Sequence, residues 1–394
     1  MTCFDLEKLK KIVEYENAKY FLWLPKSFCG ILLTLALVLF GFYPWIFGIV
    51  TQITGMPHSF LSVFACYLLF SILAEIPEEI LSLPFALYRE FSIEKRFGFS
   101  KMTVKLWLQD LLKDSVIGLI MNTLLTLCVS FAFCHFAKNW WLVVSFVLLA
   151  FVLLIQIIYP KFIAPLFNKF EPLPEGELKD KIAGLLEKIG FKNGGLFIMD
   201  ASKRSGHSNA YFSGFGKNKR IVLYDTLVNQ MTTDELVAVL GHELGHFKLK
   251  HITRRLVLTI PLIFAVMFVL FQFTHLPGIY SGFGFSIEAN QIEWVQFLGL
   301  TLVSMVWSAV AEILTPFSNI SSRRHEYQAD AFAAKTLGSG APLISALVKL
   351  NSENLSELFP PAIYVWWNYS HPTLIQRVQA LNAINAAQTE KSTT

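Results

Sequence analysis

Residues 27–50 read SFCGILLTLALVLFGFYPWIFGIV and contain no charged side chain over 24 positions. A helix that crosses a bilayer needs about 20 predominantly apolar residues, so this stretch predicts a transmembrane span. Further uncharged runs predict spans in the same way, at residues 59–74, 115–137, 139–160, 256–274 and 294–311. We therefore expect a mainly α-helical, polytopic membrane protein with six spans.

The composition excludes other classes of protein. Of the 394 residues, 54% are hydrophobic and only 16% are charged, whereas about 25% are charged in an average soluble domain. A disordered chain would be far less apolar. The net charge of +4 is attributed to loops on the cytoplasmic side of a membrane, so no nucleic-acid partner is expected. The five cysteines form no CxxC pair and are interpreted as small buried side chains.

The distribution of lysine predicts the orientation in the bilayer. The first 26 residues hold five lysines, whereas loop 51–58 holds neither lysine nor arginine. Cytoplasmic loops carry the positive excess, so both termini and the long polar blocks are expected in the cytoplasm. The predicted parts are residues 1–160 with four spans, a cytoplasmic block at 161–255, two further spans in 256–315 and a cytoplasmic block at 316–394.

The first polar block is expected to combine helices with a small β element. Residues 175–190 have the apolar spacing of an amphipathic helix. Residues 196–199 and 221–223 are predicted strands on either side of the turn-rich stretch 201–219.

The chemistry is indicated by residues 232–249, TTDELVAVLGHELGHFKL. Thr232 and Glu235 fit a capping box at the start of a helix. His242 and His246 are four positions apart, on one face of that helix, so both imidazoles can reach one metal ion. Glu243 could reach a metal-bound water without binding the ion itself. The H-E-x-x-H pattern on a capped helix predicts a hydrolytic zinc site.

Such a site takes a third protein ligand and leaves one position open. Position 252, where a metzincin would have its third histidine, is an isoleucine. His251 is five residues beyond His246, about 140° further round a continuous helix, and is expected to be a boundary or surface residue. Glu326 and Asp330 are again four apart, so one can bind the metal while the other accepts a hydrogen bond from a ligand histidine.

The segments HELGH (242–246), SRRHEYQADAFAAK (322–335) and YSHPTLIQR (369–377), preceded by residues 200–227, resemble the type I CAAX prenyl proteases, a family of integral-membrane zinc metalloendopeptidases. The resemblance extends from about residue 80 to residue 384. It implies a ring of membrane helices around a chamber, capped by a gluzincin-like zinc metallopeptidase domain with a small β element.

The resemblance also implies roles for single residues. One Zn²⁺ per chain would be bound by His242, His246 and Glu326, with Asp330 as the hydrogen-bond partner of a ligand histidine. Glu243 would be the general base, His371 would donate to the oxyanion, and Asn209 would bind a substrate carbonyl. Arg323 either binds substrate or forms a structural ion pair.

Family substrates are C-terminally prenylated CAAX proteins, so a peptide or protein substrate, prenylated or not, and the lipid bilayer are the expected partners. The chain begins too late for the extra N-terminal span of many eukaryotic members, and its C-terminus lacks a dilysine signal. These departures favour a bacterial plasma membrane over the endoplasmic reticulum. Two alternatives to CAAX processing stay open: quality control of unprenylated membrane proteins by the same chemistry, and a transporter or channel with a structural zinc site.

Overall fold

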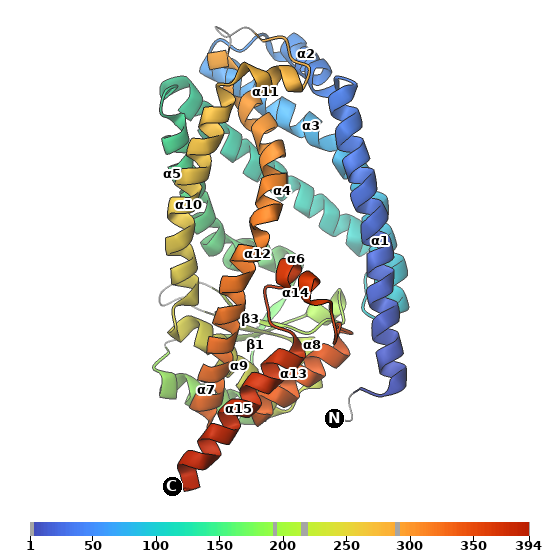
Figure 1. The fold of residues 1–394 in the computed structure, drawn as a ribbon, viewed down its shortest axis with the longest axis vertical. Coiled ribbons are helices and arrows are strands. Elements are labelled where there is room, and N and C mark those ends of the chain that lie inside the picture. The colour runs from blue at the N-terminus through green and yellow to red at the C-terminus, as the bar shows by residue number, and fades with distance from the viewer. Residues whose placement is uncertain (1–3, 192–194, 214–219, 288–291, 394) are drawn as a thin grey trace.

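The computed structural model describes residues 4–191, 195–213, 220–287 and 292–393. Within these ranges, six helices are long and apolar enough to cross a membrane (Figure 1), as expected. They are α1 (Leu6–Leu39), α3 (Phe60–Tyr88), α4 (Val104–His135), α5 (Trp140–Ile158), α10 (His251–Thr274) and α12 (Gln296–Leu337). Two of them continue beyond these bounds, α3 through η1 (Arg89–Glu94) and α5 through η2 (Tyr159–Ile163) into α6 (Ala164–Phe167).

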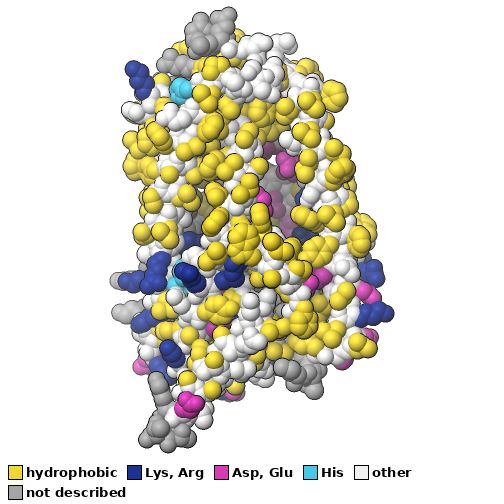
Figure 2. Space-filling view, viewed as in Figure 1, with side chains coloured by type: hydrophobic (Ala, Val, Ile, Leu, Met, Phe, Trp, Pro, Cys, Tyr) yellow, Lys and Arg dark blue, Asp and Glu magenta, His cyan; other side chains and the backbone are white. Residues whose placement is uncertain are grey.

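The long helices form a ring around a chamber. Hydrophobic side chains cover most of the outer face along these helices, and a hollow that contains acidic side chains is visible among them (Figure 2). The beginning of α1 and the end of α15 both lie toward the end of the molecule that holds the small sheet (Figure 1).

The first span does not occupy the predicted residues. Residues 27–50 are divided between α1, which ends at Leu39, and the short helix α2 (Phe42–Thr54). The chain turns between them at Gly41, whose φ of 68° is a left-handed conformation that glycine adopts without a steric penalty. Helix α1, which contains the first span, therefore begins earlier in the chain than predicted and also includes the charged N-terminal residues.

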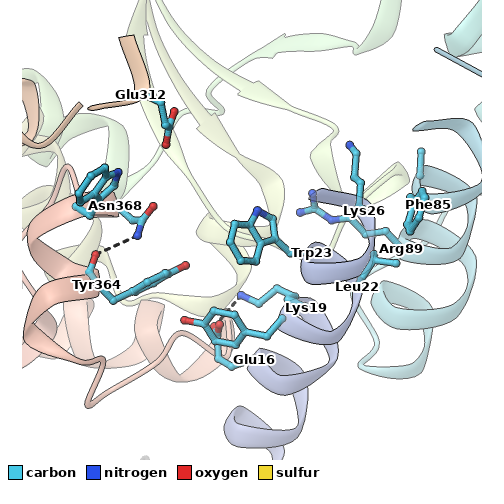
Figure 3. A pocket seen from close by; sticks show the side chains of 13 residues that line it. Glu16, Lys19, Leu22, Trp23, Lys26, Phe85, Arg89, Glu312, Tyr364 and Asn368 are labelled. Carbon is cyan, nitrogen blue, oxygen red and sulfur yellow. Dashed lines mark hydrogen bonds and ion pairs between the residues drawn. The ribbon is translucent and has the colours of Figure 1, made fainter. Parts of the chain in front are cut away.

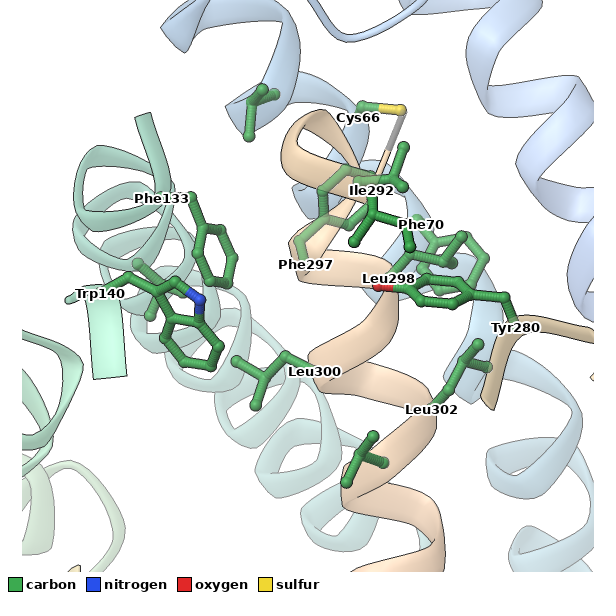
Figure 4. Packing of buried hydrophobic residues seen from close by; sticks show 14 of the residues in the cluster. Cys66, Phe70, Phe133, Trp140, Tyr280, Ile292, Phe297, Leu298, Leu300 and Leu302 are labelled. Carbon is green, nitrogen blue, oxygen red and sulfur yellow. The ribbon is translucent and has the colours of Figure 1, made fainter. Parts of the chain in front are cut away.

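The spans are held together by an aromatic-rich core at the end distant from the sheet. Figure 4 shows Phe133 and Trp140 on one side of Phe297, and Phe70 and Tyr280 on the other. The core also takes residues from α2, from α11 (Pro277–Gly282) and from η5 (Ile292–Trp294). Fully buried rings contribute large apolar areas, so this core fixes the ring of helices.

The polar half contains a four-stranded sheet with the order β1-β2-β4-β3. The strands are β1 (Phe170–Pro172), β2 (Leu196–Met199), β3 (Ala210–Ser213) and β4 (Arg220–Tyr224). Strands β2 and β4 are parallel, and the other pairs are antiparallel. Both predicted strands are confirmed. Among the described residues, strand β3 lies at an edge of the sheet, where an added strand can pair with outward-facing backbone groups.

In the described part of the chain, six further helices belong to the polar half, around this sheet. They are α7 (Glu177–Ile189), which confirms the predicted amphipathic helix, α8 (Asp225–Gln230), α9 (Thr233–Lys248), α13 (Ala341–Glu353), α14 (Ala362–Asn368) and α15 (Leu374–Thr393). Helix α12 runs without a break from the membrane core at Phe297 to Glu326 and Asp330 beside α9. One continuous helix thus links the membrane region to the polar half.

Candidate active site

Helix α9 presents both histidines of the H-E-x-x-H pattern. The predicted capping box is present: Thr232 accepts from the backbone N–H of Glu235, and the Glu235 carboxylate accepts from that of Thr232. The buried residues Leu236, Leu240 and Leu244 form the apolar face of the helix. This packing sets the rotation of α9, so His242 and His246 both face α12.

The structure brings His242, His246 and Glu326 together. Their ligand atoms all lie within 4.8 Å of one another. The two histidine Nε2 atoms are 3.1 Å apart, and they lie 3.4 and 3.2 Å from the Glu326 carboxylate. Tetrahedral ligands about 2 Å from a zinc ion would be about 3.3 Å apart. The buried Oε2 of Glu326 accepts no hydrogen bond among the described residues, so the three side chains fit a metal ion.

Asp330 lies on the far side of the His242 ring. Its Oδ1 is 2.8 Å from Nδ1 of His242, so Nδ1–H donates to Asp330 and Nε2 faces the other ligands. Burial disfavours the imidazolium, but the hydrogen bond to Asp330 and the nearby Glu326 carboxylate outweigh burial and raise the pKa of His242 to about 9. A metal ion would compete with a proton for the Nε2 lone pair of His242.

Arg377, the last residue of the segment YSHPTLIQR, is a further residue of the site, for which the sequence indicates no role. Its guanidinium donates to both oxygens of Asp330, at 2.9 and 2.6 Å, and lies 3.8 Å from Glu326. Burial opposes its charge, but the hydrogen bonds to Asp330 outweigh this and raise the pKa of Arg377. Nothing in the spacing points to it, because 47 residues separate the pair.

Glu243 and His371 face the space beside the three ligands. Desolvation raises the pKa of the Glu243 carboxyl, which favours proton acceptance nearer neutral pH. His371 Nε2 lies 3.5 Å from Glu326. Desolvation by the surrounding cleft lowers the pKa of His371, which favours the neutral ring. Its Nδ1 lies 2.9 Å from the Ser370 hydroxyl, which can donate to it and leave Nε2–H free as a donor.

Two cavities meet at these residues, and Glu243 and Glu326 line both. One, of about 120 Å³, is also lined by Asn209, His371 and Arg377. The other, of about 310 Å³, extends past His246 and the edge strand β3. The predicted residues Glu243, His371 and Asn209 thus line the same small cavity as His242 and Glu326, and His246 lines the adjoining one.

Arg323 is placed differently. It donates to the carbonyl oxygens of Val365, at 3.3 Å, and Tyr369, at 2.6 Å. It lines neither of the two cavities. These contacts hold the end of α14 just before His371, and a contact of Arg323 with substrate stays a prediction.

His251 lies at a helix boundary, as the first residue of α10, but not on the surface, which was the other alternative expected from the sequence. It is 3% exposed, and its Nδ1 is 3.0 Å from Nδ1 of His246. His246 and His251 do not lie on one continuous helix, because α9 ends at Lys248 and α10 begins at His251. Between them Lys250 has a φ of 59°, and this turn brings His251 back beneath His246.

A larger cavity, of about 770 Å³, lies between the membrane helices and α14. Figure 3 shows Trp23 and Lys26 from α1, Arg89 from η1 and Glu312 from α12 around it. Its lining is mixed, with aromatic side chains beside charged ones. A cavity of this kind can accept a molecule that has both an apolar and a polar part.

Two family profiles match the chain. The profile described as peptidase family M48 matches residues 172–385, and the profile described as CAAX prenyl protease N-terminal, five membrane helices, matches residues 2–169. In the second region, among the described residues, four helices are long and apolar enough to span a membrane.

Similar proteins are found among characterised families and solved structures. CAAX prenyl protease 1 homolog of Arabidopsis thaliana is 35% identical over 384 residues, covering 95% of this chain and 88% of that protein. CAAX prenyl protease 1 of Saccharomyces cerevisiae is 36% identical, covering 78% and 70%. The crystal structure of S. mikatae Ste24p superposes with a TM-score of 0.88 at 32% identity, covering 97% and 90%.

Proposed function

The chain belongs to peptidase family M48 and is a membrane metalloendopeptidase of the CAAX prenyl protease type, and we propose that it uses one zinc ion to hydrolyse peptide bonds near the C-terminus of prenylated proteins. The observation that carries the proposal is the meeting of His242, His246 and Glu326 beside Glu243. Two imidazoles and one carboxylate are the ligand set of hydrolytic zinc sites with an open position.

The protein's own residues would perform the proton transfers. A zinc ion bound there would act as a Lewis acid and lower the pKa of a water molecule, so that the water can lose a proton and attack near neutral pH. Glu243 accepts the proton of the attacking water and passes it to the leaving amine. His371 donates from Nε2 to the oxygen that becomes negative. Asp330, held by Arg377, keeps His242 in the tautomer that binds metal.

The substrate backbone would pair with the edge strand β3. Among the described residues β3 is an edge strand, and Asn209 directly precedes it in the cleft, where its Oδ1 accepts from the backbone N–H of Ala210. An extended peptide can add to such an edge through main-chain hydrogen bonds. Asn209 would bind one carbonyl group. The predicted element reached residue 214, which lies outside the described residues.

A lipid-bearing substrate is supported by the 770 Å³ cavity. It lies among α1, η1, α12 and α14, where Trp23 and Phe85 supply apolar surface and Lys26 supplies a cation (Figure 3). A prenyl chain would contact the aromatic part while the peptide extends to the metal site. Both termini and the metal site would face the cytoplasm. The sequence favours the plasma membrane of a bacterial cell. The curated relatives named above are eukaryotic.

Cleavage of two matched peptides tests this proposal. One is farnesylated and ends in a CAAX sequence, and the other lacks only the lipid. Purified protein should contain one zinc ion and cleave the farnesylated peptide faster. The Glu243→Gln variant should keep zinc and lose most turnover. Equal cleavage of both peptides would favour general quality control, and normal turnover by Glu243→Gln would contradict the mechanism.

A further inference from the structure

The two histidine ligands have unlike partners at their outer nitrogens. His242 donates to the Asp330 carboxylate, an anion. His246 Nδ1 instead lies 3.0 Å from Nδ1 of His251, a second imidazole. One of these two nitrogens must carry a proton and the other must not. The arrangement of the remaining contacts decides which.

Gln328 decides the tautomer of His251. The Nε2 of His251 lies 2.9 Å from the side-chain oxygen Oε1 of Gln328. An amide oxygen only accepts, so Nε2 of His251 carries a hydrogen. In the neutral ring Nδ1 is then an acceptor, and it takes the Nδ1–H of His246. That leaves the Nε2 lone pair of His246 directed at the metal position.

The His251 ring is itself held in place. It is 3% exposed and stacks on His325 with ring centroids 4.1 Å apart and an angle of 11° between the planes. His325 and Gln328 flank Glu326, the third ligand, on α12. The same helix that supplies Glu326 therefore also orients His251.

We propose that His251 is a positioning residue, which fixes the tautomer and ring orientation of His246 through the relay His246–His251–Gln328. The inference rests on the proposed zinc site. Outer hydrogen-bond partners of ligand histidines typically change metal affinity or activity by about 10- to 100-fold when removed. His251 would thus accept the Nδ1–H of His246 as a neutral group, just as the Asp330 carboxylate accepts the Nδ1–H of His242.

Zinc affinity, measured by chelator competition on the full-length protein in detergent, tests this proposal. His251→Phe keeps a ring on His325 but removes the acceptor, and should bind zinc about 10- to 100-fold more weakly. His251→Asn places an oxygen near the position of Nδ1 and should restore most of that loss. Gln328→Leu removes the acceptor of His251 and should weaken zinc binding by a smaller factor. The visible spectrum of the Co²⁺ form should change in His251→Phe and return in His251→Asn.

The controls separate this inference from the proposed function. His325→Phe retains the stacked ring and should bind zinc as wild type does. His242→Ala should abolish tight binding; if it does not, the proposed zinc site itself is wrong. If His242→Ala loses zinc while folded His251→Phe keeps wild-type affinity and cobalt spectrum, only the role of His251 is refuted. If His251→Phe does not fold, the other two variants test the role of His251. Wild-type zinc affinity in Gln328→Leu would overturn that role. So would a loss of zinc affinity in His251→Asn as large as the loss in His242→Ala.

Discussion

Gly245 of α9 packs directly against Ala329 of α12. A Cβ atom at position 245 would lie 3.0 Å from the Ala329 Cα and 3.1 Å from its carbonyl oxygen. One turn earlier, a Cβ at Gly241 would be 3.5 Å from the Cβ of Ala333. Small residues on both helices therefore allow the close approach that brings Glu326 to the two histidines.

Gly245→Ala should lower the zinc affinity of the site by pushing α9 and α12 apart. The added methyl group would clash with the Ala329 backbone, so the helices must separate, which should lower the free energy of unfolding by about 1–3 kcal/mol. Zinc affinity should fall although no ligand changes, as chelator competition would measure. Gly184→Ala on α7, where nothing lies within 4 Å, should be neutral or stabilising. Wild-type zinc affinity in Gly245→Ala would show that the helix spacing does not set the ligand geometry.

His371→Ala should lower kcat by about 10²- to 10³-fold, the usual loss for one oxyanion donor, and leave zinc content unchanged. Ser370→Ala removes the contact to His371 Nδ1 and should cause a smaller loss of kcat, because the ring can then adopt either tautomer. Steady-state kinetics with metal analysis would measure both. An effect of His371→Ala on KM alone would assign the residue to ground-state binding instead.

Glu235 should make stability depend on pH. The side chain is buried and accepts from Ser345, Lys349 and the Thr232 backbone. Burial alone would raise the pKa of Glu235, but the hydrogen bonds to Lys349, Ser345 and Thr232 lower it below its usual 4.5. A folded-state pKa below the unfolded value stabilises the fold above about pH 4.5, and this stabilisation is lost as the pH falls.

Thermal unfolding of Glu235→Gln as a function of pH would measure this effect. The variant should be destabilised by about 1–3 kcal/mol near pH 7, and the difference from wild type should shrink below pH 4.5. Glu187→Gln, an exposed change on α7, should differ from wild type by less than about 0.5 kcal/mol throughout. A difference for Glu235→Gln that stays constant down to pH 3 would refute the role of its charge.

Tyr15→Phe should affect substrate binding more than the chemical step. The Tyr15 hydroxyl on α1 donates to the buried Glu94 carboxylate, at 2.9 and 3.0 Å. Glu94 lies 3.4 Å from His207, which directly precedes Ser208 and Asn209. Losing the donor should cost about 1–3 kcal/mol of stability and raise KM, because the segment carrying Asn209 is less firmly held.

Kinetics and thermal unfolding of Tyr15→Phe would be compared with those of Tyr88→Phe, a matched change at an exposed position. The control should leave both quantities near wild type. A fall in kcat at unchanged KM for Tyr15→Phe would argue against a link from α1 to the substrate-binding segment.

Patterns within about one helix turn or one strand could be predicted from the sequence by itself. The uncharged runs give the number of spans, because a bilayer requires about 20 apolar residues whatever the tertiary fold. The capping box, the face shared by His242 and His246, and the strand at residues 196–199 follow from local spacing. Roles such as that expected for His371 came from a family resemblance.

Contacts between distant residues were decided only by the tertiary structure. Arg377 meets Asp330 from 47 residues away, and no periodicity encodes that approach. The reversal at Lys250 moved His251 from an expected surface to a buried contact with His246, and the turn at Gly41 divided the first predicted span. A single left-handed residue redirects everything after it, and the close crossing of α9 and α12 then determines which side chains meet.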